Sequence, residues 1–318
     1  MSEVVMAQRR SCDKCFYYLP SVRYCTKLEV IVSDPSSPPC LMPTRRASLR
    51  SVASAAKVEG ALSKPQPPSS SDEFVPTGID GLDEILSGGF LRGKTYLIAG
   101  ETGTGKTIFS LQFLIHGALN GEPGVYLAID EPTEHLLRGV RRFGWGIVDE
   151  LIEKRRLLFL DMRTHFSRIY LRDEKRRIEP KFVIEQILKN VDRIGAKRLV
   201  IDPIAPLMYG GSGDVLQARE FLREMVFALE RRRDVTTIMT SEIPTGSKQL
   251  SRFGVEEFLA TGIIMLGLEE INGRIYRVMF IRKARWSPVR PSKYVFEIVR
   301  AKGIVLKGPI EQVYRSGR

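Results

Sequence analysis

The sequence of 318 residues lacks any apolar run long enough to cross a membrane as a helix. Such a helix needs about 20 consecutive, mostly apolar residues, and polar or charged residues interrupt every apolar run of this chain before that length. The first residues also lack the apolar core of a secretory signal peptide. We therefore expect no membrane span and a cytoplasmic location.

Cysteine is scarce and confined to one end of the chain. The four cysteines are Cys12, Cys15, Cys25 and Cys40. The first two form a C-x-x-C pair, and the other two follow at wider, irregular gaps. A structural zinc ion bound by four thiolates would explain how so short a segment holds a fold, and we favour this interpretation. An iron–sulfur cluster, a redox dithiol and free thiols are the alternatives.

Residues that build a core are also scarce between positions 43 and 73, where Ser, Ala and Pro dominate. Such a segment buries too little apolar surface to fold, so we interpret residues 43–73 as a flexible linker. No long internal repeat is visible. We therefore expect one large domain at residues 74–307, preceded by a cysteine-rich knob at residues 1–42 and followed by a polar tail at residues 308–318.

Acidic residues are too few to balance the basic ones, and the net charge is +12. Residues 1–73 contain 10 basic and 7 acidic residues, so most of the excess lies in the large domain. A basic surface suits nucleic acid, an acidic partner or a membrane surface. An ion-paired surface of a heat-adapted protein explains the same charge equally well. Charge alone therefore identifies no partner.

The clearest chemical signal is a glycine-rich loop that fits the pattern G-x-x-x-x-G-K-[ST]. Its residues are Gly100, Glu101, Thr102, Gly103, Thr104, Gly105, Lys106 and Thr107. The apolar run at residues 96–99 predicts a buried strand before the loop, and apolar residues at helical spacing predict a helix that begins near Lys106. In this arrangement, glycines let the backbone N–H groups converge on a phosphate at the positive end of the helix.

The last two residues of the loop indicate the kind of phosphate. Lys106 can reach the β- and γ-phosphates of a nucleotide, and the Thr107 hydroxyl can join the coordination shell of Mg²⁺. We therefore predict that the chain binds a nucleoside triphosphate, ATP in our interpretation, together with Mg²⁺.

Two acidic residues follow the next apolar strand, which we expect at residues 124–129. Asp130 and Glu131 stand at its carboxyl end, where ligands bind in parallel sheets. Hydrolysis needs a carboxylate that orients and partly deprotonates the attacking water, so both are candidate bases. Adjacent strand residues point to opposite faces, which favours a direct role for one of them. The alternative is that they only cap the next helix.

Two later strands end in an aspartate that can hold Mg²⁺. Asp161 follows the apolar residues 157–160, and Asp202 follows the apolar residues 199–201. A helical pattern and the basic pair Lys197–Arg198 precede the second strand. This order is more typical of the magnesium-binding strand of ATPases with such a glycine-rich loop than the residues before Asp161 are. We therefore favour Asp202 over Asp161.

The C-terminal part contains a predicted β-hairpin and a basic motif. Asn272–Gly273 between two apolar runs is a strong hairpin signal. Lys283 and Arg285 follow and project on the same side of an extended segment. Because they are far along the chain from the glycine-rich loop, we expect them to reach a phosphate in a neighbouring subunit. Glu242 ends another predicted strand, where a polar group either senses the γ-phosphate or only ends the strand.

From about Phe74 to Leu306 the chain resembles the KaiC-like branch of the RecA superfamily of P-loop ATPases. Besides the loop and the Asp202 strand, the matching segments are residues 77–83, 87–90, 130–133, 143–145, 252–258 and 283–285. The resemblance implies an α/β fold with a mostly parallel, twisted sheet between helices. It also implies ATP bound at subunit interfaces, usually in a hexameric ring, with Lys283 and Arg285 at the neighbour's γ-phosphate.

Three functions are compatible with these features. The resemblance favours a slowly hydrolysing ATPase that forms an oligomeric regulatory or signalling module. The charge of +12 and the loops at residues 203–214 and 244–253 support the alternative of a DNA-binding, recombinase-type ATPase. In the third hypothesis the cysteine-rich knob docks an unidentified protein partner. Some two-domain relatives phosphorylate their own Ser or Thr, so autokinase activity is a secondary hypothesis for this single-domain chain.

Overall fold

The computed structural model describes residues 73–162, 180–208, 215–244, 251 and 256–312, and the backbone of three short strands nearer the N-terminus. The chain divides into two units, Met1–Pro65 and Gln66–Arg318. In the first unit, the described strands pair in an antiparallel sheet in the order β1-β2-β3. They are β1 (Tyr18–Leu19), β2 (Tyr24–Cys25) and β3 (Val30–Ile31).

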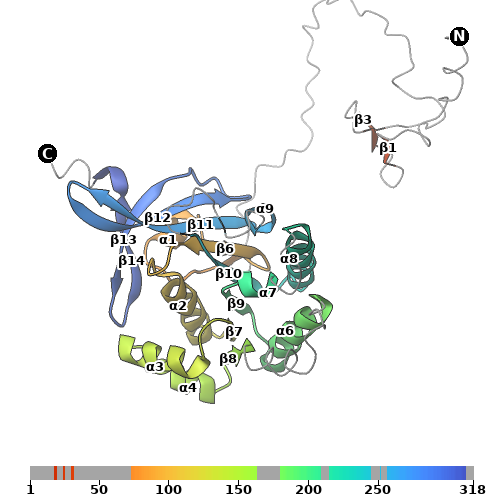
Figure 1. The fold of residues 1–318 in the computed structure, drawn as a ribbon, viewed down its shortest axis with the longest axis horizontal. Coiled ribbons are helices and arrows are strands. Elements are labelled where there is room, and N and C mark those ends of the chain that lie inside the picture. The colour runs from red at the N-terminus through yellow and green to blue at the C-terminus, as the bar shows by residue number, and fades with distance from the viewer. Residues whose placement is uncertain are drawn as a thin grey trace, which may run out of the picture. The chain divides into compact units, whose positions relative to one another are not determined.

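The second unit is built on a nine-stranded sheet with the order β14-β13-β12-β11-β6-β10-β9-β7-β8 (Figure 1). The six neighbouring strands β11, β6, β10, β9, β7 and β8 are parallel to one another. The strands β12, β13 and β14 are antiparallel to their neighbours. The parallel strands are β6 (Thr95–Gly100), β7 (Gly124–Ala128), β8 (Leu157–Asp161), β9 (Arg198–Asp202), β10 (Thr236–Glu242) and β11 (Gly262–Ile271). The short strands β4 (Phe74–Val75) and β5 (Phe90–Leu91) form a separate pair.

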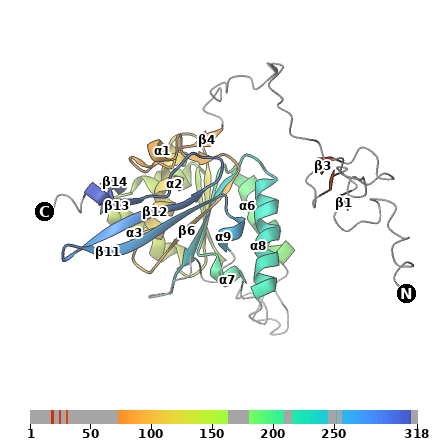
Figure 2. The same cartoon turned by 90° about the horizontal axis from the view of Figure 1, so that it is seen from above.

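Helices cover both faces of the sheet, because alternate residues of its central strands are apolar on both sides. Ile98 and Tyr126 belong to the core that includes α2, α3 and α4, whereas Leu97 and Val125 belong to the core that includes α6 and α8. Figure 2 shows α6 and α8 side by side on one side of the sheet. The helices are α1 (Leu82–Ile85), α2 (Lys106–Leu119), α3 (Thr133–Phe143), α4 (Ile147–Glu153), α6 (Pro180–Ile194), α7 (Ala205–Met208), α8 (Val215–Glu230) and α9 (Glu256–Leu259). The predicted mostly parallel sheet between helices is confirmed.

The predicted hairpin joins β11 to β12 (Arg274–Ala284), and Ile271 pairs with Arg274 across its turn. Asn272 and Gly273 both have positive φ, 51° and 72°, which this two-residue turn requires. The sheet continues with β13 (Lys293–Val299) and β14 (Gly303–Pro309).

The end of β14 differs from the expected end of the large domain at residue 307. The strand continues to Pro309, and Ile310 after it is buried in a small apolar cluster with Ile271, Val278 and Val295. Ile310 therefore packs with residues of the hairpin and of β13.

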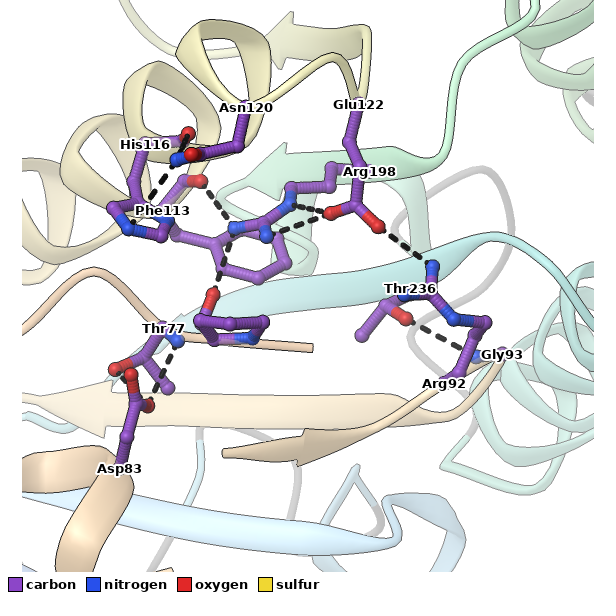
Figure 3. A network of polar contacts seen from close by, with 11 residues as sticks. Thr77, Asp83, Arg92, Gly93, Phe113, His116, Asn120, Glu122, Arg198 and Thr236 are labelled. Atoms are coloured by element: carbon purple, nitrogen blue, oxygen red, sulfur yellow. Dashed lines mark hydrogen bonds and ion pairs between the residues drawn. The ribbon is translucent and has the colours of Figure 1, made fainter. Parts of the chain in front are cut away.

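Arg198, half of the basic pair before the Asp202 strand, has a structural role (Figure 3). Its side chain is 1% exposed and forms a 2.7 Å ion pair with Glu122. The guanidinium also donates to the carbonyl oxygens of Pro76 and Phe113, at 2.9 and 2.8 Å. A Cβ atom at Gly117 would lie 2.2 Å from the Arg198 Nε atom, so only glycine leaves room for the arginine here. Arg198 thus ties the start of β9 to α2 and to the segment before α1.

Candidate nucleotide-binding site

The glycine-rich loop joins β6 to α2, as predicted: the strand ends at Gly100 and the helix begins at Lys106. Gly105, just before the helix, has a φ of 109°, a conformation that strongly favours glycine. At Gly100, a Cβ atom would lie 2.3 Å from the Leu266 carbonyl oxygen on the neighbouring strand. The Thr104 hydroxyl donates to the Glu101 carbonyl at 2.8 Å and closes the turn. The backbone therefore has the geometry of a phosphate-binding loop.

Lys106 is 8% exposed, and its ammonium group lies against the loop. The Nζ atom donates to the carbonyl oxygens of Gly100 and Glu101, both at 2.9 Å. Burial lowers the pKa of Lys106, and the negative charges of Glu242 and Asp202 oppose this shift. The ammonium therefore contacts the loop, and Lys106 lines the same cavity as both acidic residues.

Asp202, at the end of β9, accepts hydrogen bonds from three hydroxyl groups. The Thr107 Oγ1 atom donates to its Oδ2 atom at 3.0 Å. The Tyr126 hydroxyl donates to the same oxygen, and the Thr240 hydroxyl donates to Oδ1. Burial and then the Asp202 charge raise the pKa of Tyr126 well above 10.0, so its phenol is protonated and donates.

Asp161, the other aspartate considered for Mg²⁺, ends the edge strand β8. In the sheet order, β10 alone separates Asp202's strand from β6, whereas β10, β9 and β7 separate β8 from β6. The structure therefore brings Asp202, and not Asp161, to the loop threonine. Tyr126 and Thr240 were not identified from the sequence as site residues. The feature that could have indicated them is a hydroxyl-bearing side chain within an otherwise apolar strand.

A cavity of about 410 Å³ lies over the loop and is lined by Lys106, Thr107 and acidic groups from three strand ends. These acidic residues are Asp130, Glu131, Asp202 and Glu242. Thr102, Gly103 and Gly105 from the loop and the apolar Leu136 and Ile298 complete much of the lining. The carboxyl ends of parallel strands meet at one edge of the sheet, which explains why acids distant in sequence share one cavity.

Lys283 and Arg285 do not belong to the described lining of this cavity. The Lys283 Nζ atom donates to the carbonyl oxygens of Glu257 and Ala260, at 2.9 and 2.7 Å. An Arg285 NH2 group donates to the Phe258 carbonyl at 3.3 Å. Burial and then the Arg285 charge lower the pKa of Lys283, while the Glu257 charge opposes them. Both cations are therefore held at the end of α9.

Other predicted site residues lie outside the described part of the chain. They are much of the loops at residues 203–214 and 244–253, and the side chains of Cys12, Cys15, Cys25 and Cys40. Within the described residues, no group of three or more His, Cys, Asp or Glu side chains is arranged to hold a metal ion. None of the described helices is both long and apolar enough to span a membrane.

A loop, its helix and strand-end carboxylates in one cavity characterise a P-loop ATPase, and comparison with known proteins identifies the family. A sequence model described as "ATPase: KaiC" matches residues 75–310. The chain belongs to the KaiC family of ATPases. This confirms the predicted relationship to the KaiC-like branch of the RecA superfamily.

Individual KaiC-like proteins agree with this assignment. A UPF0273 protein of Thermotoga maritima is 34% identical over 239 residues, which cover 73% of this chain and 95% of that protein. The circadian clock protein KaiC2 of Synechocystis is 30% identical over 72% of this chain, but the match spans only 39% of KaiC2. The crystal structure of a KaiC-like protein from Pyrococcus horikoshii is 36% identical, with a TM-score of 0.62, and the match covers 73% of this chain and 98% of that one.

Proposed function

We propose that this KaiC-family protein binds ATP with Mg²⁺, hydrolyses it slowly and works as an oligomeric regulatory or signalling module. The observation that carries the proposal is the shared cavity of Lys106, Thr107, Asp202, Asp130 and Glu131. Lys106 can bind phosphate, and the Thr107 hydroxyl and the Asp202 carboxylate can hold a cation. Asp130 or Glu131 can accept a proton from the attacking water.

The residues present suit Mg²⁺ bound with a nucleotide. The Thr107 hydroxyl lies 3.0 Å from the Asp202 carboxylate, so one oxygen donor and one acid stand together at the cavity. Mg²⁺ in such sites takes one or two protein ligands and completes its shell with water and phosphate oxygens. When bound, the cation neutralises charge on the phosphates. Thr107 and Asp202 would hold it.

The chemistry assigned to the chain's own residues is hydrolysis. The loop N–H groups bind the phosphates, and Lys106 binds their terminal oxygens in place of its present carbonyl partners. Glu131 or Asp130 orients the attacking water and accepts its proton. Glutamate has the longer reach, which favours Glu131 as the base.

The proposed assembly is a ring, hexameric by resemblance, in which ATP lies between subunits. The position of Lys283 and Arg285 supports this arrangement, because they are held at α9 and not in the described cavity lining of their own chain. In a ring they would approach the γ-phosphate of the neighbouring subunit and stabilise its charge during hydrolysis. A relative named as a circadian clock protein supports a regulatory role.

The test of this proposal is ATP turnover by purified protein, with and without single-stranded DNA, at two salt concentrations. Slow turnover that does not respond to DNA is expected. Strong, salt-sensitive stimulation by DNA would favour the recombinase-type alternative, because phosphate contacts make binding steeply dependent on salt. No turnover under any condition would contradict both.

The N-terminal part is a separate proposal. We infer a zinc-binding knob at residues 1–42, joined by a linker at residues 43–73 to a cytoplasmic ATPase domain. The protein denatured by heat should release about one zinc ion per chain, because four thiolates complete one tetrahedral site. Release of iron, or of no metal, would reject zinc. Loss of a protein partner on deletion of residues 1–73, with ATPase activity retained, would identify the knob as a docking module.

A further inference from the structure

The two strands that flank β9 each direct a hydroxyl group at Asp202. Tyr126 comes from β7 on one side and Thr240 from β10 on the other. Asp202 lies opposite Ala128 of β7 in the strand register. Both hydroxyls belong to residues of the sheet itself, so their positions are determined by strand pairing and not by a loop.

Both side chains are immobilised by packing. Tyr126 is 2% exposed, and its ring stacks on that of Phe159 with centroids 5.5 Å apart. Thr240 is fully buried. A buried hydroxyl is costly to leave without a partner, and Asp202 accepts from both. The carboxylate therefore has little freedom to rotate.

The restraint on Asp202 determines the orientation of Thr107. The Thr107 hydroxyl has one proton, which it donates to the Asp202 Oδ2 atom at 3.0 Å. With this proton directed at Asp202, the Thr107 oxygen can present a lone pair to a cation in the cavity that Thr107 lines. If Asp202 rotated away, the proton could point into the cavity, where it would repel a cation.

We propose that Tyr126 and Thr240 are positioning residues that hold Asp202 in the orientation required for Mg²⁺ to bind with the nucleotide. The inference rests on the proposed function, because it concerns the same site. Neither hydroxyl needs to touch the nucleotide or the cation. Their contribution is indirect, like that of groups that orient metal ligands elsewhere.

The test measures binding of a fluorescent ATP analogue in EDTA and in Mg²⁺, with Mn²⁺ binding to the nucleotide complex followed by electron paramagnetic resonance. In Tyr126→Phe, which removes only the hydroxyl, the gain in affinity due to Mg²⁺ should fall about tenfold, and Mn²⁺ should bind correspondingly more weakly. Thr240→Val should behave similarly, whereas Thr240→Ser, which keeps a hydroxyl, should retain most of the gain. If Tyr126→Phe does not fold, the comparison of Thr240→Val with Thr240→Ser tests the positioning role.

Tyr96→Phe is the matched control. Tyr96 is also a buried tyrosine of a central strand, but its hydroxyl accepts from the Leu91 N–H at 2.8 Å and is absent from the cavity lining. Its removal should leave the Mg²⁺-dependent gain unchanged. The positioning role alone would be overturned if Tyr126→Phe and Thr240→Val kept the Mg²⁺-dependent gain in affinity of the wild type. It would also be overturned if Tyr96→Phe lost as much of that gain as they do. Failure of the unmodified protein to bind nucleotide would overturn the proposed function as well.

Discussion

The Thr107 hydroxyl oxygen lies 3.0 Å from the Asp202 carboxylate, although 95 positions separate the two residues in the chain. Thr107 is the second residue of α2, directly after the glycine-rich loop, and Asp202 ends β9, which lies two places from β6 in the sheet. Their contact joins the phosphate-binding loop to the acid proposed for Mg²⁺.

Asp202→Asn should weaken the Mg²⁺ dependence of nucleotide binding and lower turnover at least about tenfold, because the carboxylate charge is lost beside Thr107. Asp161→Asn is the matched control, since Asp161 ends the edge strand. Turnover measured against Mg²⁺ concentration separates the two aspartates. A larger effect of Asp161→Asn would reverse our assignment.

Lys106→Ala should abolish nucleotide binding or turnover, since the ammonium is the main positive charge at the loop. The measurement is the rise in melting temperature on addition of ATP and Mg²⁺, which reports ligand binding to the folded state. Lys154→Ala removes an exposed lysine directly after α4 and should keep the full rise. Unchanged turnover in Lys106→Ala would exclude this cavity as the ATPase site.

Glu131→Gln and Asp130→Asn distinguish the two candidate bases, which both line the cavity. The variant that lacks the true base should lose about 10²- to 10⁴-fold in the rate of hydrolysis and still bind ATP, because general base catalysis contributes that much. Single-turnover kinetics gives the rate of the chemical step. Small losses in both variants would assign the base to another residue.

Arg285→Ala should leave assembly intact and lower turnover, because the guanidinium is proposed to act on the neighbour's nucleotide. Arg282→Ala, which removes an exposed arginine of β12 three residues earlier, is the control for the loss of one positive charge. Native mass spectrometry reports the assembly, and a phosphate-release assay reports turnover.

Mixed rings of Arg285→Ala and Glu131→Gln chains provide the decisive comparison. A site shared between subunits can combine the intact base of one chain with the intact arginine of the other, so partial activity should return. Absence of rescue would indicate that Arg285 acts within its own chain.

Glu122→Gln should lower the free energy of unfolding by about 2 kcal/mol at neutral pH, since it weakens a charged hydrogen bond to the buried Arg198. Burial by itself would raise the pKa of Glu122, but the charges and hydrogen bonds of Arg198 and Arg92 lower it below 4.5. A depressed carboxyl pKa stabilises the fold above the unfolded pKa, and this contribution is lost as the pH falls through the folded pKa.

The difference in the free energy of unfolding between wild type and Glu122→Gln should therefore be largest near neutral pH. It should decrease below about pH 4.5. Urea unfolding at pH 7 and at several acidic pH values measures it. Glu150→Gln, which changes an exposed ion pair with Lys154, should change stability little at either pH. A difference that does not vary with pH would show that the Glu122 charge is not the cause.

The local elements of this protein can be predicted from the order of its residues. The loop from Gly100 to Thr107 and the Asn272–Gly273 turn are recognisable because backbone geometry at a few adjacent residues selects glycine there. The alternation of apolar residues in β6 and β7 likewise indicates strands buried on both faces. The family resemblance followed from several such local motifs in order.

Contacts between side chains far apart in the chain became visible only in the folded protein. The order of strands brought Asp202, and not Asp161, to Thr107, and strand pairing placed the hydroxyls of Tyr126 and Thr240 beside Asp202. The same holds for Arg198, which the sequence identified only as half of a basic pair and whose side chain is buried against α2. These contacts depend on pairings between segments far apart in the chain, and no local propensity encodes which strands become neighbours.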